Sequence, residues 1–374
     1  MINVCEPTFM GNELKYVMEC MKSGWISSSG KFIKKFEDNF SEYCGVNYGV
    51  SCTSGTTAIH LALEAMEIGK GDEVIIPTFT MIGACNAVIY SGARPVLVDS
   101  ELETWNMDTS KIEEKITKRT KAIMVMHTYG HPVYLDKVRE LSNNYNIPII
   151  EDAAEAHGAE YKGKKTGGLG DVACFSFYAN KLLTTGEGGM VVTSNEKWAE
   201  NARLLRNHYF GEPRFLHKKV GYNYRLTNLQ AAIGLAQLEK IEYYVKCRRN
   251  NAKIYNKLLK NVNGLRTPPE AKWAKNVYWM YGLLVEEEFG ISMPELRQKL
   301  GKKGIDTRTF FIGMHKQPAY HGNDKRFPDT SGDYPISDEL ERKGFYLPSS
   351  SHLTKEEIIK IAAVIKSIQE EKKK

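Results

Sequence analysis

Short apolar runs alternate with amphipathic segments from about residue 48 to residue 195. Seven of the runs have the length and composition of β-strands: Tyr48–Cys52, Glu73–Pro77, Pro95–Asp99, Ala122–His127, Pro148–Asp152, Val172–Phe177 and Met190–Thr193. Stretches with helical spacing of apolar residues separate several of them: Thr56–Glu67, Met81–Ser91 and Leu135–Tyr145. Because strands that alternate with helices form mostly parallel sheets covered on both faces, this pattern predicts a large α/β sheet.

The pattern changes after residue 224. A long helical stretch is expected over Thr227–Leu259, with Thr227 as its N-cap, and a final surface helix over Thr354–Glu371. We therefore expect two domains. Residues 1–240 would form the large domain with an N-terminal arm, and residues 241–374 a smaller C-terminal α/β domain.

The composition is that of a globular protein, with 42% hydrophobic and 26% charged residues. No apolar run approaches the ~18 to 20 residues needed to cross a bilayer. The net charge of +6 is spread along the chain and does not indicate nucleic-acid binding. The seven scattered cysteines include no C-x-x-C pair, which favours free thiols in a reducing cytoplasm. We therefore expect a cytoplasmic protein without membrane or nucleic-acid partners.

Ligands of open parallel sheets bind at the carboxyl ends of the strands, so the polar residues that follow the predicted strands are the candidates for chemistry. These residues are the turn Ser54–Thr57, His127, the pair Glu151–Asp152, Ser176 and, a few residues further on, Lys181.

Each of these residues also has an ordinary structural interpretation. The turn Ser54–Thr57 could present backbone N–H groups to a phosphate or simply cap a helix. Asp152 could hold a ring nitrogen protonated or act as an N-cap. Lys181 could form a Schiff base with an aldehyde or be one surface lysine among many. Their joint placement at strand ends favours the functional interpretation.

The chain resembles the DegT/DnrJ/StrS family of sugar aminotransferases almost from end to end. The matching stretches are Gly24–Ser28, Ser54–Ala58, Gly71–Ile75, Glu151–Ala156, Gly170–Asp171, Phe175–Phe177, Asn180–Lys181, Thr185–Gly189 and Gly221–Arg225. The spacing of Asp152, Ser176 and Lys181 is the most specific part of the match. The resemblance implies the fold-type-I architecture of enzymes that use pyridoxal 5′-phosphate.

The resemblance also implies roles for individual residues. Lys181 would be the catalytic lysine, bound covalently to pyridoxal 5′-phosphate, which alternates with pyridoxamine 5′-phosphate during turnover. Asp152 would pair with the ring nitrogen of the cofactor. Glu155 would lie near its phenolic oxygen, where many relatives carry glutamine.

The phosphate of the cofactor would be held, by the same resemblance, by Gly55, Thr56 and Ser176 of one chain and by Asn223 of a second. The resemblance therefore implies a homodimer with shared active sites. Met81 would cover the cofactor ring at a position where the family usually has an aromatic residue. A thioether can also contact a ring face favourably.

The substrate is indicated by motifs within the family, in particular Trp25–Ser28, Thr184–Met190 and Gly313–His315. They are most similar to those of enzymes that transfer the amino group of L-glutamate to C4 of GDP-4-keto-6-deoxymannose. Such enzymes release 2-oxoglutarate and GDP-perosamine, a sugar of bacterial surface polysaccharides. Related enzymes act on UDP- or dTDP-linked sugars, sometimes at C3, so the nucleotide and the carbon stay open.

Four residues are candidate substrate contacts: Trp25, Ser27, His127 and His315. Either histidine could equally be a hydrogen-bonded structural residue. The H-x-x-x-H spacing of His127 and His131 does not predict a zinc site, because a glycine and a proline interrupt the helix that such a pair would need.

Two other classes of function fit the same fold. One is a pyridoxamine-dependent deoxysugar dehydratase, in which histidine replaces the family lysine; the presence of Lys181 argues against it. The other is a scaffold without catalysis, which the presence of Asp152, Ser176 and Lys181 together disfavours.

Overall fold

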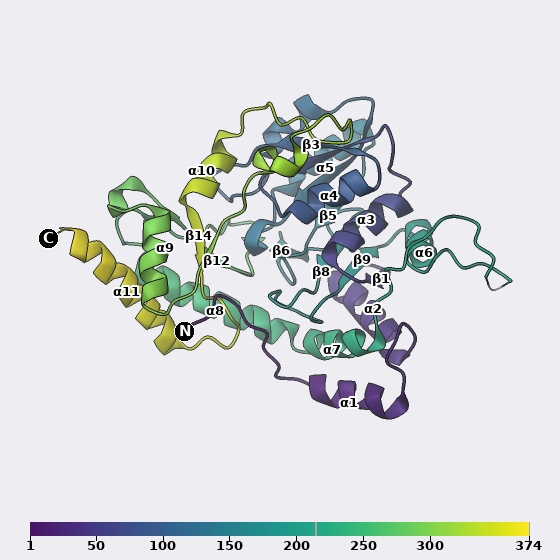
Figure 1. The fold of residues 1–374 in the computed structure, drawn as a ribbon, viewed down its shortest axis with the longest axis horizontal. Coiled ribbons are helices and arrows are strands. Elements are labelled where there is room, and N and C mark those ends of the chain that lie inside the picture. The colour runs from purple at the N-terminus through teal and green to yellow at the C-terminus, as the bar shows by residue number, and fades with distance from the viewer. Residues whose placement is uncertain (214, 374) are drawn as a thin grey trace.

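A seven-stranded sheet forms the centre of the larger part of the computed structural model, which describes residues 1–213 and 215–373 (Figure 1). Its strands are β1 Tyr48–Cys52, β2 Glu73–Pro77, β3 Arg94–Val98, β4 Thr120–Met126, β5 Ile149–Asp152, β8 Val172–Ser176 and β9 Gly189–Thr193. The seven predicted strands are confirmed, and none of their ends is displaced by more than two residues. Lys374, the last residue of the expected C-terminal domain, lies outside the described residues.

The strands follow the order β1-β9-β8-β5-β4-β2-β3, and β2, β3, β4, β5 and β8 pair in parallel. Only β9 runs antiparallel to its neighbours β1 and β8 within this sheet. The sheet is therefore mostly parallel, as expected. The carboxyl ends of β5 and β8 lie at one edge, which places Asp152 and Ser176 on adjacent strands.

Helices cover both faces of the sheet because its side chains point alternately to the two faces and are apolar on both. On one face, α3 (Gly55–Ala65), α4 (Ile82–Tyr90) and α6 (Glu196–Leu205) pack against side chains such as Val74 and Ile76. On the other face, α2 (Lys31–Cys44), α5 (Leu135–Tyr145) and α7 (Asn228–Leu238) pack against alternate positions such as Ile75 and Phe175.

The expected single helix over residues 227–259 is wrong: the segment forms two helices, α7 and α8 (Ile241–Leu259). Lys240, between them, has φ −115° and ψ 7°, outside the helical region. The two helices pack on different partners, α7 against α1 (Glu13–Ser23) and α2, and α8 against α11 (Lys355–Lys373). One straight helix could not pack against both sets of partners. The break coincides with the domain boundary expected at residue 240.

A second, four-stranded antiparallel sheet lies to the left in Figure 1, beside α9 (Met293–Lys302) and α11. Its strands are β10 Leu265–Arg266, β12 Tyr281–Val285, β14 Gly344–Leu347 and β13 Arg308–Thr309, in that order. The last helix has the expected cap, since Thr354 Oγ1 accepts a hydrogen bond from Glu357 N–H. None of the helices within residues 1–213 and 215–373 is both long and apolar enough to cross a bilayer.

The remaining elements are short. They are β6 Glu160–Tyr161, β7 Lys164–Lys165 and β11 Ala274–Lys275, which form a three-stranded sheet, the helix α10 Pro335–Lys343, and the 3-10 helices η1 Thr109–Lys111, η2 Glu113–Lys115, η3 Thr128–Gly130, η4 Glu287–Phe289, η5 Met314–Lys316 and η6 Pro318–Tyr320.

The N-terminal segment connects the two larger sheets. Ile2 forms a parallel bridge with Ile305, and the Val4 carbonyl accepts a hydrogen bond from Ser349 N–H. The chain then continues to α1, which packs on α7 below the seven-stranded sheet (Figure 1). Residues at the start of the chain are thus fixed to the C-terminal sheet, while the helix that follows belongs to the other layer.

The cap of α7 generates a stability prediction. Thr227 Oγ1 accepts a hydrogen bond of 3.2 Å from Gln230 N–H, and the Gln230 side chain returns one of 3.1 Å from Thr227 N–H. Replacing Thr227 with alanine removes this reciprocal cap and should lower the free energy of unfolding by about 1 kcal/mol, measured by urea denaturation. Thr227→Ser, which keeps the hydroxyl, should stay close to wild type; equal losses in both variants would contradict the capping role.

Candidate active site

The N-terminus of α3 opens at the carboxyl edge of the sheet, directly after β1. Ser54 caps the helix: its Oγ accepts a hydrogen bond of 3.1 Å from Thr57 N–H, and Thr57 Oγ1 accepts one of 2.9 Å from Ser54 N–H. The turn is therefore a helix cap. It still presents N–H groups to a ligand, because those of Gly55 and Thr56 have no carbonyl partner within the helix. The partial positive charge there favours an anion such as phosphate.

Gly55 allows α3 to approach β8 closely. A Cβ atom at Gly55 would lie 2.7 Å from Ser176 Cβ and 3.2 Å from its Oγ. Any side chain at Gly55 would thus push the helix away from the end of β8. The Ser176 hydroxyl consequently lies beside the first N–H groups of α3, where it can join them in binding an anion.

Met81 lies at the N-terminus of α4, close to the same position. A Cβ atom at Gly83 would lie 2.5 Å from Thr56 Oγ1, so the starts of α3 and α4 converge. Met81 Sδ accepts a hydrogen bond of 3.0 Å from Gly83 N–H, and the side chain is 51% exposed. It is therefore an accessible apolar group at the rim of the predicted phosphate site.

Asp152 is buried at the end of β5. Its Oδ1 accepts a hydrogen bond of 3.2 Å from Ala154 N–H, but only turns follow, not the helix that an N-cap would begin. Burial raises the pKa of Asp152, opposed by the hydrogen bond and by the charge of Lys181. Such a carboxylate gains stability from a cationic partner, for which a protonated ring nitrogen is suitable.

Lys181 follows β8 and reaches back to the same edge of the sheet. Its Nζ lies 3.6 Å from Glu155 Oε1 and 3.7 Å from the centre of the Trp279 ring. The side chain is only 11% exposed. Burial lowers the pKa of Lys181, although Glu155 and Asp152 act in the opposite direction. The neutral amine is the nucleophilic form, and a larger fraction of Lys181 is therefore neutral than of a surface lysine at the same pH.

His127 has both ring nitrogens engaged and no exposed surface. Its Nδ1 accepts a hydrogen bond of 3.2 Å from Val133 N–H, so Nε2 carries the proton and donates to Glu151 Oε2 at 2.9 Å. Burial favours the neutral form of Glu151, but the His127 hydrogen bond and backbone N–H groups, including that of Gly167, lower its pKa overall. This geometry supports the structural alternative for His127, since no ring nitrogen is free to meet a substrate.

His315 is similarly held. Its Nδ1 lies 2.8 Å from Thr78 Oγ1 and its Nε2 2.9 Å from Asp338 Oδ1, while the ring stacks on Tyr334 at 4.5 Å. His315 thus links the loop after β2 to α10. Both predicted histidines connect elements of the fold around the site.

Trp25, Ser27 and Asn223 are separate from the cluster around Lys181. The backbone carbonyl groups of Trp25 and Ser27 accept hydrogen bonds from Asn228, and the side chains of both residues are exposed. Asn223 is also exposed and forms an isolated bridge with Asn207. No contact among the described residues joins these three to Lys181 within one chain. The structure therefore brings the predicted cofactor-binding residues of the sheet edge together around Lys181, whereas these three residues lie at the surface.

Trp279 was not predicted from the sequence. It lies just before β12, its ring covers Lys181, and its Nε1 donates a hydrogen bond of 2.8 Å to the carbonyl oxygen of Asn180. The apolar run Val277–Tyr281 shows only that the segment is buried. Nothing in its spacing indicates which residue meets a lysine almost a hundred positions earlier.

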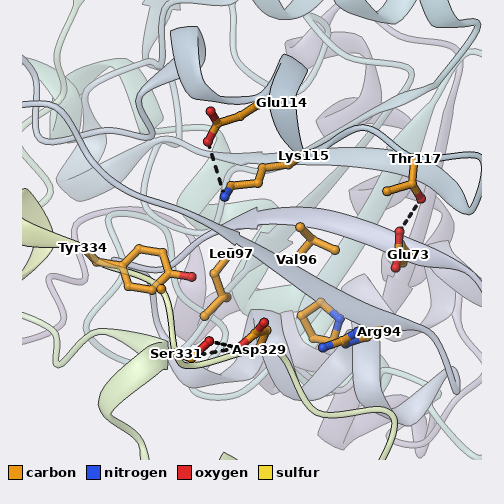
Figure 2. A pocket seen from close by; sticks show the side chains of 12 residues that line it. Glu73, Arg94, Val96, Leu97, Glu114, Lys115, Thr117, Asp329, Ser331 and Tyr334 are labelled. Carbon is orange, nitrogen blue, oxygen red and sulfur yellow. Dashed lines mark hydrogen bonds and ion pairs between the residues drawn. The ribbon is translucent and has the colours of Figure 1, made fainter.

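A cavity of about 310 Å³ lies at the opposite end of the strands, where β2 and β3 begin (Figure 2). Its charged side chains have partners already: Glu73 binds Arg119 and Thr117, and Lys115 pairs with Glu114. The cavity is thus remote from the carboxyl edge and is not part of the candidate site.

Comparisons with known proteins agree with this geometry. The sequence profile of the DegT/DnrJ/EryC1/StrS aminotransferase family matches residues 7–366. The chain is 43% identical to the GDP-perosamine synthase of Caulobacter vibrioides, covering 98% of both chains, and 43% identical to that of Escherichia coli O157:H7, covering 99% of both. A solved structure of the PLP form of Spr1654, a putative sugar aminotransferase from Streptococcus pneumoniae, superposes with a TM-score of 0.89 at 27% identity, covering 99% of both chains.

The close packing of Gly55 on Ser176 predicts the effect of a single methyl group. Gly55→Ala should weaken binding of pyridoxal 5′-phosphate by about tenfold or more, equivalent to about 1.4 kcal/mol, because the Cβ displaces the N–H groups that are expected to hold its phosphate. Absorbance titration of the cofactor-free protein measures this affinity. Gly301→Ala in α9 is the matched control, since a Cβ there meets nothing within 4 Å. Unchanged affinity in Gly55→Ala would contradict the assignment of the α3 N-terminus as the phosphate site.

Proposed function

The chain belongs to the DegT/DnrJ/EryC1/StrS aminotransferase family, and on this basis we propose that it uses pyridoxal 5′-phosphate to transfer the amino group of L-glutamate to a nucleotide-linked keto-sugar. The observation that carries the proposal is the buried amine of Lys181, which lies beside the carboxylates of Asp152 and Glu155 at the sheet edge where α3 begins. Burial lowers the pKa of this amine. This arrangement offers a nucleophile, a partner for a ring cation and an anion site together.

The residues present fit pyridoxal 5′-phosphate. The space kept open by Gly55 beside Ser176 suits its phosphate, Asp152 suits its ring nitrogen, and Lys181 suits its aldehyde carbon. When bound, the cofactor supplies an electron-withdrawing ring on which the amino group is carried between the two substrates. Met81 would lie near the ring, in the position expected from the sequence.

The other steps of the proposed reaction are carried out by residues of the chain. Lys181 holds the cofactor covalently between turnovers, and its freed amine moves the proton that each half of the reaction requires. Asp152 keeps the ring nitrogen protonated. Trp279 covers one side of Lys181 and restricts water around the amine. The two half-reactions share one site, so ping-pong kinetics are expected.

The proposed sugar substrate is GDP-4-keto-6-deoxymannose, aminated at C4 to give GDP-perosamine. The support is 43% identity over almost the whole chain to two proteins named GDP-perosamine synthase. Lys181 disfavours the dehydratase alternative, in which histidine replaces this lysine. A UDP- or dTDP-linked sugar is the second candidate, because the residues assigned to the cofactor do not indicate which nucleobase the substrate contains.

We also propose that the protein is a homodimer in which each site is completed by the partner. Asn223, expected to reach the cofactor phosphate of another chain, is exposed here. Leu14, Met18 and Met21 form an exposed apolar stripe along α1, with Leu14 76% exposed. Because their spacing places them on one helix face, they suit burial against a second copy.

The substrate assignment is tested with a panel of sugars. The purified enzyme, L-glutamate and either GDP-, UDP- or dTDP-4-keto-6-deoxyhexose are incubated separately, and NMR of each product locates the new nitrogen. The expected result is amination of the GDP-linked sugar at C4 with release of 2-oxoglutarate. Lys181→Ala should show no turnover. Full turnover in that variant would refute the mechanism. Amination of a UDP-linked sugar alone would contradict only the proposed identity of the substrate.

The dimer is tested by placing acidic side chains on the α1 stripe. The double variant Leu14→Asp, Met18→Asp should sediment as a monomer and lose transfer activity, because two carboxylates would be buried in the interface. Lys15→Asp adds an acid next to the stripe and serves as the control. A double variant that sediments like wild type would show that this helix face is not the interface.

A further inference from the structure

Glu155 is held in a fixed orientation beside Lys181. Its Oε2 accepts a hydrogen bond of 2.8 Å from Tyr129 N–H, and its Oε1 lies 3.6 Å from Lys181 Nζ. Tyr129 has a left-handed backbone, with φ 52°, which bulky residues adopt at an energetic cost. The fold thus maintains a strained residue whose N–H group directs the carboxylate toward the amine.

Few other charges face this pair. Within residues 1–213 and 215–373, Lys181 is the one cation that forms an ion pair with Glu155, and Asp152 is the other carboxylate that acts on both. The remaining titratable groups around the pair are the ordinarily neutral side chains of Tyr129 from η3, Tyr346 from β14, Cys5 from the N-terminal segment and His157 after β5.

Burial acts on the two partners in opposite directions. It raises the pKa of Glu155 to about 7 and lowers that of Lys181. A buried lysine is therefore a readily available nucleophile but a weak base, because its charged form is poorly solvated. The proposed function requires both properties, since the freed amine must remove a proton from carbon. A carboxylate at 3.6 Å favours the ammonium form and so strengthens the base.

We propose that the Glu155 carboxylate, held 3.6 Å from Lys181 Nζ, stabilises the ammonium form of Lys181 and so makes this residue able to carry a proton between two carbon atoms. This inference rests on the proposed function. In the first step, the Cα–H bond of the amino donor breaks, a new N–H bond forms on Lys181, and the electron pair is withdrawn into the bound cofactor. In the second, that N–H bond breaks as the proton is delivered to the receiving carbon. Glu155 stabilises Lys181 in the interval, when it is positively charged.

The substitution Glu155→Gln isolates the charge. Glutamine has nearly the same shape, and its carbonyl oxygen can still accept the hydrogen bond from Tyr129 N–H. In the cofactor-free protein, the pH at which the Lys181 amine becomes half reactive should fall by about one unit or more, as expected for loss of an opposite charge within 4–6 Å. Acetic anhydride labelling across a pH series, followed by mass spectrometry of the Lys181 peptide, measures this midpoint.

Glu187→Gln is the matched control, because Glu187 is an exposed carboxylate in the loop that follows Lys181. It should keep the wild-type midpoint. Equal Lys181 labelling at high pH in all three proteins, with matching circular dichroism spectra, shows that the site is intact. An unchanged or higher midpoint in Glu155→Gln would overturn the inference, since a merely structural glutamate would leave the titration of Lys181 unaltered.

A second measurement concerns the proton transfer itself. Conversion of the loaded enzyme by L-glutamate, followed by absorbance in a single turnover, should be slower in Glu155→Gln and show a larger isotope effect with α-deuterated glutamate. A smaller isotope effect would contradict the role. Failure of the proposed function is distinguishable from failure of the inference, because the labelling experiment uses neither cofactor nor substrate.

Discussion

The contact between the Lys181 amine and the Trp279 ring, at 3.7 Å, joins the two large parts of the molecule. Lys181 follows β8 of the seven-stranded sheet, whereas Trp279 precedes β12 of the four-stranded one. Neither sheet alone would exclude water from the amine. Because the pKa of Lys181 is lowered chiefly by burial, the chemistry at the edge of one sheet depends on the docking of the other.

The alternation of side chains along β5 gives its two terminal carboxylates different roles. Glu151 is fully buried and satisfied by His127 and by backbone N–H groups of the turn at residues 167–170. Asp152 has one backbone hydrogen bond and faces Lys181. Adjacent positions on a strand point to opposite faces, so one acid stabilises the fold and the next remains available to a ligand.

The sequence was sufficient to predict the seven strands and the cluster of Asp152, Ser176 and Lys181, because strand ends and phosphate-binding turns are local patterns. It did not predict the break between α7 and α8, which arises from packing on two different layers. It could not assign Trp279 to Lys181 or distinguish structural from substrate-binding histidines, since both depend on contacts between distant segments. The roles of all the predicted site residues, Trp25, Ser27 and Asn223 among them, and the boundary at residue 240 stay predictions.

The attachment of the N-terminal segment to the C-terminal sheet has a consequence for how the chain folds. Ile2 and Val4 bind partners near residues 304–305 and 349, so these contacts close loops of some three hundred residues. Contacts of such high sequence separation form slowly, because the loop entropy is lost before the contact is gained. All seven strands of the large sheet, by contrast, lie within residues 48–193. We therefore expect the N-terminal segment to attach to the C-terminal sheet late in folding, after the strands in the middle of the chain have paired.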